Sequence, residues 1–235
     1  MVIRPGGSPR AAFDKCFHEK VPTMSIELTW LGHGSWLVHV KSSKTGEHRI
    51  LVDPFLDDSP TAPVKSDAVS ADFILVSHGH FDHVADAAKI ARRTGATVIS
   101  NYEICEWLGK QGIERTHPHN LGGGSAQAFG RVQLTVAFHS SMLPDGTYGG
   151  NPSGFLLTLD EAKLYFACDT ALFGDMRLIG ERGIDLAVLP IGDQFTMGPD
   201  DALRAVKLIE PKVVVPSHYG TWPPIVQDAE AWPPV

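Results

Sequence analysis

The chain has 235 residues, 43% of them hydrophobic, and a formal net charge of −7 at pH 7. This length and apolar content suffice for one α/β domain with a sizeable core. The acidic balance argues against a broad surface for nucleic acid or membrane, and no stretch reaches the roughly 18 apolar residues of a membrane span. A phosphate-containing small molecule stays compatible, because bound divalent cations would make a site locally positive.

The termini and the cysteines indicate how the chain is organised. Cys16, Cys105 and Cys168 are too few and too scattered for a disulfide framework, which predicts a reducing, cytoplasmic setting. Residues 1–23 are rich in proline and glycine and lack the apolar stretch of a signal peptide, so they predict a flexible N-terminal extension. Residues 24–235 are then expected to form a single domain, with Met24 as an alternative start.

The first half of the chain alternates strand and helix patterns. Period-two alternation and short apolar runs predict strands, and 3.6-residue spacing that ends near a glycine predicts helices. The expected elements are strands at 26–31, 36–40, 49–53 and 73–76, a helix at 84–93, a strand at 97–99 and a helix at 102–110.

The second half of the chain shows the same kinds of strand and helix patterns. We expect strands at 132–138, 154–159, 163–167, 186–189 and 213–215, with a helix that begins at Pro199. Two strand-rich halves with interspersed helices predict two packed sheets with helices outside, a four-layer αββα sandwich.

A cluster of polar residues follows the buried strand at 73–76. The segment Ser77-His78-Gly79-His80-Phe81-Asp82-His83 places three imidazoles and a carboxylate within six residues, just before a helix. Such a concentration is costly unless something satisfies it, and these groups are ligands for zinc, manganese or iron. His78 and His80 alternate on extended chain and can share one ion, while Asp82 and His83 come after the turn and can face a second.

The pattern His-x-His-x-Asp-His resembles the signature of the metallo-β-lactamase superfamily. In that superfamily further ligands stand at the ends of later strands. This sequence offers His139, Asp169 and His218, each directly after an apolar strand pattern. Each alone could be a structural residue, but together with the first motif they favour a metal site.

The resemblance implies a role for each of these residues. The ligands of the first metal would be His78, His80 and His139, and those of the second Asp82, His83 and His218. Asp169 would bridge the two ions. Asp53, in Val52-Asp53-Pro54, resembles the superfamily's buried aspartate that orients ligands without binding metal, although a turn or cap aspartate is the alternative.

Further motifs resemble a microbial family of metal-dependent hydrolases that is related to ascorbate-6-phosphate lactonase. They are Leu31-Gly32-His33-Gly34-Ser35, Asp53-Pro54-Phe55, His139-Ser140-Ser141, Asp169-Thr170, Pro190-Ile191-Gly192-Asp193 and Thr196-Met197-Gly198-Pro199. The similarity covers roughly residues 24–222. Two features depart from it: Cys168 stands where a glycine commonly precedes the bridging aspartate, and the chain ends soon after Trp222-Pro223-Pro224.

These residues imply a metal-dependent hydrolase that uses a hydroxide bound between two divalent metal ions. The metals would be Zn²⁺, with Mn²⁺ or Fe²⁺ as alternatives, and Asp82 and Asp169 would take part in catalysis as well as in binding. The bond would be of the ester type, in a lactone, phosphodiester or thioester of a small molecule. His33 and Tyr219 are weaker candidates for contacting substrate or donating a proton, and a structural role is an equal alternative for each.

Two other functions stay open on the sequence alone. One is an iron-dependent oxidoreductase on the same fold, and the other is a metal-binding module without catalysis. Iron content with oxygen uptake would favour the first of these. The sequence leaves the oligomeric state open, with a homo-oligomer among the alternatives.

Overall fold

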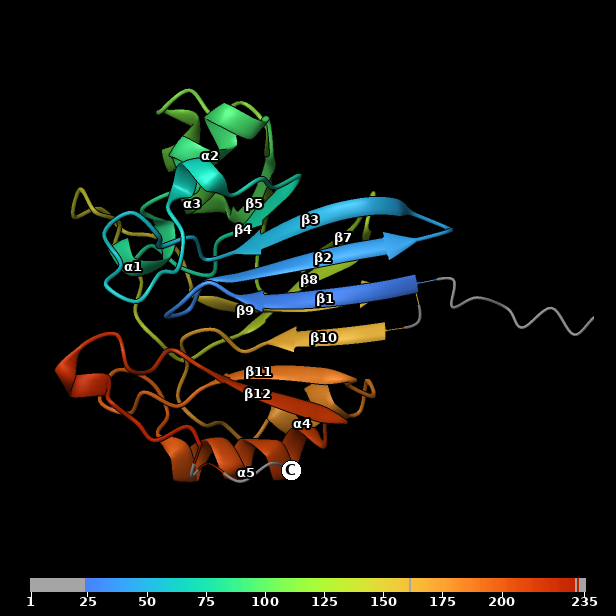
Figure 1. Cartoon of the computed structure of the whole chain (residues 1–235), viewed down its shortest axis with the longest axis vertical. Coiled ribbons are helices and arrows are strands. Elements are labelled where there is room, and N and C mark those ends of the chain that lie inside the picture. Colours follow the sequence, from blue (N-terminus) through green and yellow to red (C-terminus); the bar gives the residue numbers. More distant parts are fainter. Residues whose placement is uncertain (1–23, 161, 231, 233–235) are drawn as a thin grey trace, which may run out of the picture.

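The computed structural model describes residues 24–160, 162–230 and 232, so the predicted extension at 1–23 lies outside the described residues. Two six-stranded sheets pack together, with helices on their outer sides (Figure 1). The first sheet consists, in spatial order, of β1 (Met24–Trp30), β2 (Trp36–Ser42), β3 (Gly46–Val52), β4 (Phe73–Leu75), β5 (Thr97–Asn101) and β6 (Thr116–His119).

The second sheet comes from the other half of the chain. From one edge to the other it contains β12 (Val213–Ser217), β11 (Leu186–Pro190), β10 (Ala162–Phe166), β9 (Ser153–Leu159), β8 (Gly130–Val136) and β7 (Gly124–Gln127). The helices are α1 (Phe81–Val84), α2 (Ala87–Thr94), α3 (Tyr102–Gly109), α4 (Met176–Gly180) and α5 (Pro199–Ile209), with 3-10 turns at Ser66–Ala68 and Pro223–Ile225. The expected four-layer sandwich is confirmed.

Alternation along the strands produces three separate cores. Successive side chains of a strand point to opposite faces, so Ile74 packs beneath α1–α3 whereas Leu75 packs between the sheets. In β10, Phe166 lies between the sheets and its neighbour Tyr165 packs toward α4 and α5. Because both faces of these strands are covered, their sequences are apolar except for Lys163 near the start of β10.

The helix expected at 84–93 is interrupted. Helix α1 ends at Val84 and α2 begins at Ala87, and Asp86 between them serves the preceding loop instead. The Asp86 N–H donates to the carbonyl of Pro54 at 3.1 Å, and its carboxylate accepts from the N–H groups of Leu56 at 2.6 Å and Asp57 at 3.0 Å. The predicted end of this helix is confirmed, because Gly95 takes the left-handed conformation that terminates it.

Three short elements, β6, β7 and α4, were not predicted. They span four or five residues each and include polar or glycine-rich sequence such as Gly124–Gln127. Whether such short segments form strands depends on pairing with a neighbouring strand. Here β6 pairs in parallel with β5, and β7 pairs with β8.

Parallel pairing brings several strand ends to one edge of the molecule. Strands β3 to β6 are parallel to one another in the first sheet, and β10 to β12 are parallel in the second. The loops that leave their carboxyl ends therefore meet at that edge, where α/β proteins place their sites. No helix of the described residues combines the length and apolar character that crossing a bilayer requires.

Gly154 tests the tight pairing of β9 with β10. A Cβ at this position would lie 2.6 Å from the carbonyl oxygen of Phe166 and 3.0 Å from that of Ala167, both of them backbone atoms. We expect Gly154→Ala to lower the free energy of unfolding by about 1–3 kcal/mol because the backbone must shift. Denaturant unfolding measures this, and Gly109→Ala is the control because nothing lies within 4 Å of its new methyl group. Equal stability of the two variants would contradict the prediction.

Candidate metal centre

The predicted ligands come from separate strand ends and lie together. His78 and His80 follow β4, Asp82 and His83 belong to α1, and the other three follow one strand each. These three are His139 after β8, Asp169 after β10 and His218 after β12. The seven side chains differ in their exposure to solvent. Four are buried, namely His78, His83, Asp169 and His218, and three are partly exposed, namely His80, Asp82 and His139.

Three groups of ligand atoms among the described residues are compact enough to hold a metal ion. One combines Asp53 with His78 and His83, and the other two correspond to the predicted metal sites. The first of these two consists of His78, His80 and His139, whose ligand atoms lie within 4.8 Å of one another. The Nε2 atom of His78 is 3.0 Å from Nδ1 of His80. This is the set that the sequence predicted for the first metal.

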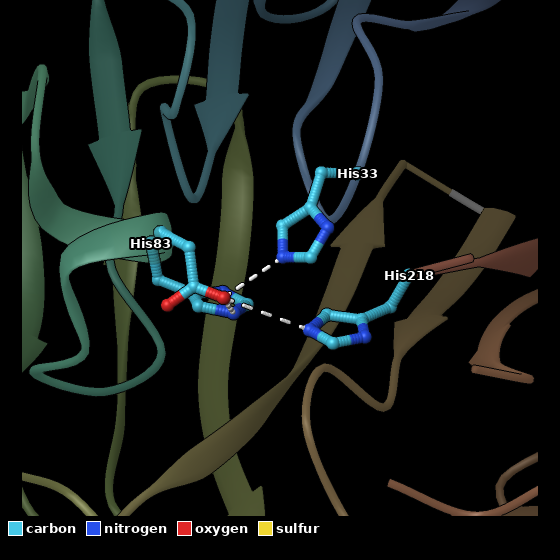
Figure 2. Close-up of side chains that lie close together, drawn as sticks. His33, His83 and His218 are labelled. Carbon is cyan, nitrogen blue, oxygen red and sulfur yellow. Dashed lines mark hydrogen bonds and ion pairs between the residues drawn. The ribbon is translucent and has the colours of Figure 1, made fainter. Parts of the chain in front are cut away.

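The second group contains one residue more than the prediction. Besides Asp82, His83 and His218 it includes His33 from the turn between β1 and β2, and all four offer atoms within 4.8 Å of one another. Figure 2 shows the rings of His33, His83 and His218 approaching a common space from three separate parts of the chain. The Nε2 atom of His33 lies 2.9 Å from Oδ2 of Asp82.

Asp169 links the two groups. Its Oδ2 atom lies close to the Nε2 atoms of four histidines: 3.1 Å from His218, 3.3 Å from His83, 3.5 Å from His139 and 3.9 Å from His78. One carboxylate oxygen thus faces histidines of both groups, which is the position that a bridging ligand requires.

Asp53 and Ser77 orient two of the imidazoles. Asp53 accepts hydrogen bonds from the Ser77 N–H at 2.7 Å, the Ser77 hydroxyl at 2.6 Å and Nδ1 of His83 at 2.9 Å. Since the Ser77 hydroxyl donates its only proton to Asp53, its oxygen accepts a hydrogen bond from Nδ1 of His78 at 2.9 Å. Both rings therefore carry a proton on Nδ1 and direct Nε2 toward the cluster.

The donor set fits divalent cations. Nε2 of His83 and both ring nitrogens of His218 are buried and have no hydrogen-bond partner among the described residues. A buried polar atom without a partner is costly, on the order of 1–3 kcal/mol. Nitrogen and carboxylate atoms aimed at a shared space are the ligands of zinc and related metals, so a cation there would satisfy Nε2 of His83 and Nε2 of His218.

Burial and neighbouring charges shift the pKa values in this cluster. Burial lowers the pKa of His78 well below its usual value. Burial opposes ionisation of Asp169 and Asp82, but nearby imidazoles outweigh it and hold the pKa of both carboxyl groups below the usual range. Conversely, burial lowers the pKa of His83, yet Asp169, Asp82 and Asp53 together raise it well above the ordinary value.

Unusual backbone conformations concentrate at the same edge. Eight non-glycine residues of the described chain have positive φ, and three of them are His33 (50°), Asp53 (44°) and His218 (53°). Cys168, which precedes Asp169, has a φ of 52°. Such conformations cost energy and are found where surrounding structure fixes a functional geometry.

Neither His33 nor Tyr219 lines the pocket above the cluster, unlike the partly exposed ligands. The His33 ring is fully buried and its Nδ1 lies 2.8 Å from the hydroxyl of Thr221. Tyr219 stacks on Trp30 with ring centroids 5.1 Å apart and is not one of the residues that line the pocket above the cluster. Sequence reasoning missed Thr221, since an isolated threonine after a strand carries no signal for its partner.

Comparison with known proteins agrees with this geometry. Residues 48–219 match the family model described as the beta-lactamase superfamily domain. A Thermus thermophilus protein named as a UPF0173 metal-dependent hydrolase is 48% identical over 207 residues, which cover 88% of this chain and 89% of that protein. The chain belongs to the UPF0173 metal-dependent hydrolases of the metallo-beta-lactamase superfamily. It is therefore an enzyme of the metal-dependent hydrolase class.

The fold of this UPF0173 chain is also similar to those of solved structures. A metallo hydrolase from the archaeon Ignicoccus hospitalis superposes with a TM-score of 0.78 at 35% identity, covering 89% of each chain. An isothiocyanate hydrolase from Delia radicum gut bacteria gives a TM-score of 0.69 at 21% identity over 87% of this chain and 89% of that one. The second likeness shows the fold alone.

The lowered histidine pKa values predict acid sensitivity of the metal-free UPF0173 protein. Burial, then His218, lowers the pKa of His33 from 6.5 to about 4, and burial also lowers those of His78, His80 and His139. Below pH 6.5 the unfolded chain therefore takes up protons that the folded chain refuses, and the free energy of unfolding falls. His33 alone contributes about 1 kcal/mol between pH 7.5 and 5.5, and His83 acts in the opposite direction.

Guanidinium unfolding in the presence of a chelator at these two pH values measures the effect. We expect a lower unfolding midpoint at the lower pH. An unchanged or higher midpoint would mean that these histidines are protonated in the folded protein.

Proposed function

We propose that this enzyme hydrolyses an ester-type bond, in a lactone, phosphodiester or thioester, of a small molecule. The observation that carries the proposal is the sharing of the Asp169 carboxylate between two groups of ligand atoms. The net charge of −7 supports a small molecule over a long nucleic acid. Resemblance to the relatives of ascorbate-6-phosphate lactonase supports a lactone among the candidate bonds.

Two divalent cations fit the ligand groups, and Zn²⁺ suits them best, with Mn²⁺ and Fe²⁺ as alternatives. When bound, such ions lower the pKa of a water molecule and polarise the bond under attack. His78, His80 and His139 would hold one ion, Asp82, His83 and His218 the other, and Asp169 would contact both.

The chain's own side chains keep their charges suited to this task. Asp82 and Asp169 have lowered pKa values and stay ionised at neutral pH, so they act as anionic ligands and are weak bases. Neither serine beside the cluster is needed as a nucleophile. Ser140 contacts Nε2 of His80 at 3.3 Å, and Ser141 binds the backbone of Gly79 and Gly149.

His33 positions Asp82 in this proposal. An ionised carboxylate only accepts hydrogen bonds, so Nε2 of His33 donates its proton to Asp82 at 2.9 Å. The neutral ring then has a lone pair on Nδ1, which accepts from the Thr221 hydroxyl at 2.8 Å. The chain Thr221–His33–Asp82 fixes the carboxylate from behind, and the full burial of His33 keeps it out of reach of substrate. Tyr219, stacked on Trp30, keeps a structural role.

Metal reconstitution tests the proposed function. We expect elemental analysis to find about two transition-metal ions per chain, and the loaded protein to hydrolyse at least one ester, lactone, thioester or phosphodiester. His80→Ala removes a partly exposed ligand, so it should lose metal and at least about 100-fold in kcat/KM with little change in unfolding midpoint. His117→Ala is the matched control, because His117 lies on β6 outside the ligand groups.

The outcomes separate the candidate functions. A folded wild-type protein that stays metal-free with zinc, manganese and iron all supplied would overturn the proposal. Iron binding with substrate-dependent oxygen uptake and no hydrolysis would establish the oxidoreductase alternative. Full metal loading without hydrolysis of any of these bonds would overturn the proposed ester-type substrate.

Thr221 tests the positioning role of His33 without altering a ligand. Thr221→Ala removes the hydroxyl that fixes the His33 ring, so we expect zinc affinity to fall by about tenfold. Thr221→Ser keeps the hydroxyl and should restore the wild-type affinity. Competition with a chromogenic chelator measures both. Equal affinities of the two variants would show that the hydrogen bond from Thr221 does not support the site.

A further inference from the structure

An open pocket lies directly above the metal-ligand cluster. Its volume is about 470 Å³, within the usual range for small-molecule sites. Five side chains of the cluster face it, so its floor is the proposed reaction centre. Phe81, Phe195, Trp222 and Pro224 form its walls, together with the hydroxyl of Ser140.

One wall is a packed aromatic group. Phe81 is 56% exposed, although its ring contacts Phe55 at a centroid distance of 5.7 Å and Trp222 at 6.0 Å. Trp222 also packs on the buried ring of His33 at 4.9 Å. The Phe81 ring is therefore held in place while much of its apolar surface stays in contact with water, beside Asp82. An exposed but fixed aromatic ring next to a reaction centre is what binding of an apolar group requires.

Another part of the wall comes from the loop after β11. Phe195 is 53% exposed and follows two residues of positive φ, Asp193 (64°) and Gln194 (27°). The loop is fixed at its far end, because the Met197 N–H donates to the carbonyl of Thr170 at 3.0 Å, next to Asp169. The backbone that carries this second exposed phenyl ring is thus anchored beside the same floor.

The pocket walls carry no positively charged side chain among the described residues. None of the described residues that line the pocket is lysine or arginine, and its ionisable groups are those of the metal-ligand cluster. An anionic group of a substrate that lay beyond the metal ions would find no cation in these walls, whereas an apolar group would be removed from water by three aromatic rings.

We infer that the substrate is a neutral carboxylic ester, lactone or thioester whose acyl portion is aromatic or aliphatic and lies between Phe81 and Phe195. This inference rests on the proposed hydrolytic function and narrows it, since it disfavours phosphodiesters. In the reaction, the oxygen of water bonds to the acyl carbon, the bond from that carbon to the leaving oxygen or sulfur breaks, and the leaving group receives a proton. An ester or thioester gives a carboxylic acid and an alcohol or thiol, and a lactone gives a single hydroxy acid.

Hydroxamates test the walls without requiring turnover, because their metal-chelating group is constant while the attached group varies. With the zinc-loaded protein, we expect benzohydroxamate to bind about tenfold more tightly than acetohydroxamate in calorimetric titration. A para-carboxylate on the phenyl ring should remove most of that gain.

Variants locate the effect. Phe81→Ser and Phe195→Ser should each reduce the affinity ratio of the two hydroxamates toward one. Leu178→Ser is the control, since Leu178 is 51% exposed on α4 and does not line this pocket. A wild-type ratio near one, or a ratio that neither phenylalanine variant lowers, would overturn the inference.

Hydrolysis distinguishes this inference from the broader proposal. Para-nitrophenyl butyrate should be a better substrate in kcat/KM than para-nitrophenyl acetate and than bis(para-nitrophenyl) phosphate, which share its leaving group. Preference for the phosphodiester would overturn the inference and leave the hydrolase intact. The expected hydroxamate ratio without hydrolysis of any substrate would support the apolar walls and overturn the proposed hydrolysis of an ester-type bond.

Discussion

The carboxylate of Asp169 lies buried among imidazoles, and the rest of the structure depends on compensating this group. Its Oδ2 atom is 3.1 Å from His218 Nε2 and 3.3 Å from His83 Nε2, and its pKa is held well below the usual range. A buried charge is tolerated only with partners in good geometry, so each partner must itself be fixed. Asp53 fixes His83 from the opposite side, and Ser77 ties the same aspartate to His78. The cluster is therefore a chain of dependent contacts that holds only if several strand ends keep their places.

The two sheets are joined at the point where this requirement is strictest. Each sheet is built from one half of the chain. The core between the sheets is apolar, and apolar packing does not fix the orientation of the partners as hydrogen bonds do. At the site, however, the carbonyl of His33 accepts from Trp30 Nε1 at 2.9 Å, from the His218 N–H at 3.1 Å and from the Ser217 hydroxyl at 3.2 Å. Directional bonds thus connect the first turn of one sheet to the last strand of the other. The positive φ values of His33 and His218 are the cost of bringing these loops together.

Sequence patterns predicted the elements that follow a periodic spacing of apolar residues. They did not predict features that depend on one contact between distant residues. The apolar strands and the ligands at their ends follow from periodicity and from the resemblance of His78–His83 to a known signature. The four-layer sandwich follows from the same alternation, because strands that are apolar on both faces must be covered on both. The break between α1 and α2 depends on Asp86 accepting hydrogen bonds from a loop 29 and 30 residues earlier in the chain. The pairing of Thr221 with His33 spans 188 residues and left no pattern in either segment.

The walls of the pocket differ from its floor in what constrains them. Phe81 directly precedes the ligand Asp82, and Trp222 follows His218 by four residues, so the segments that place ligands also place the walls. If the cluster holds metal as proposed, its ligands cannot change without loss of metal, whereas a wall side chain that is half exposed can change at little cost in folding. Selection for a new substrate would therefore act on the identity of Phe81 and Phe195 and leave their backbone unchanged. This separation of a fixed floor from replaceable walls explains in physical terms how one metal centre can serve different substrates, and why the motif alone does not name the substrate.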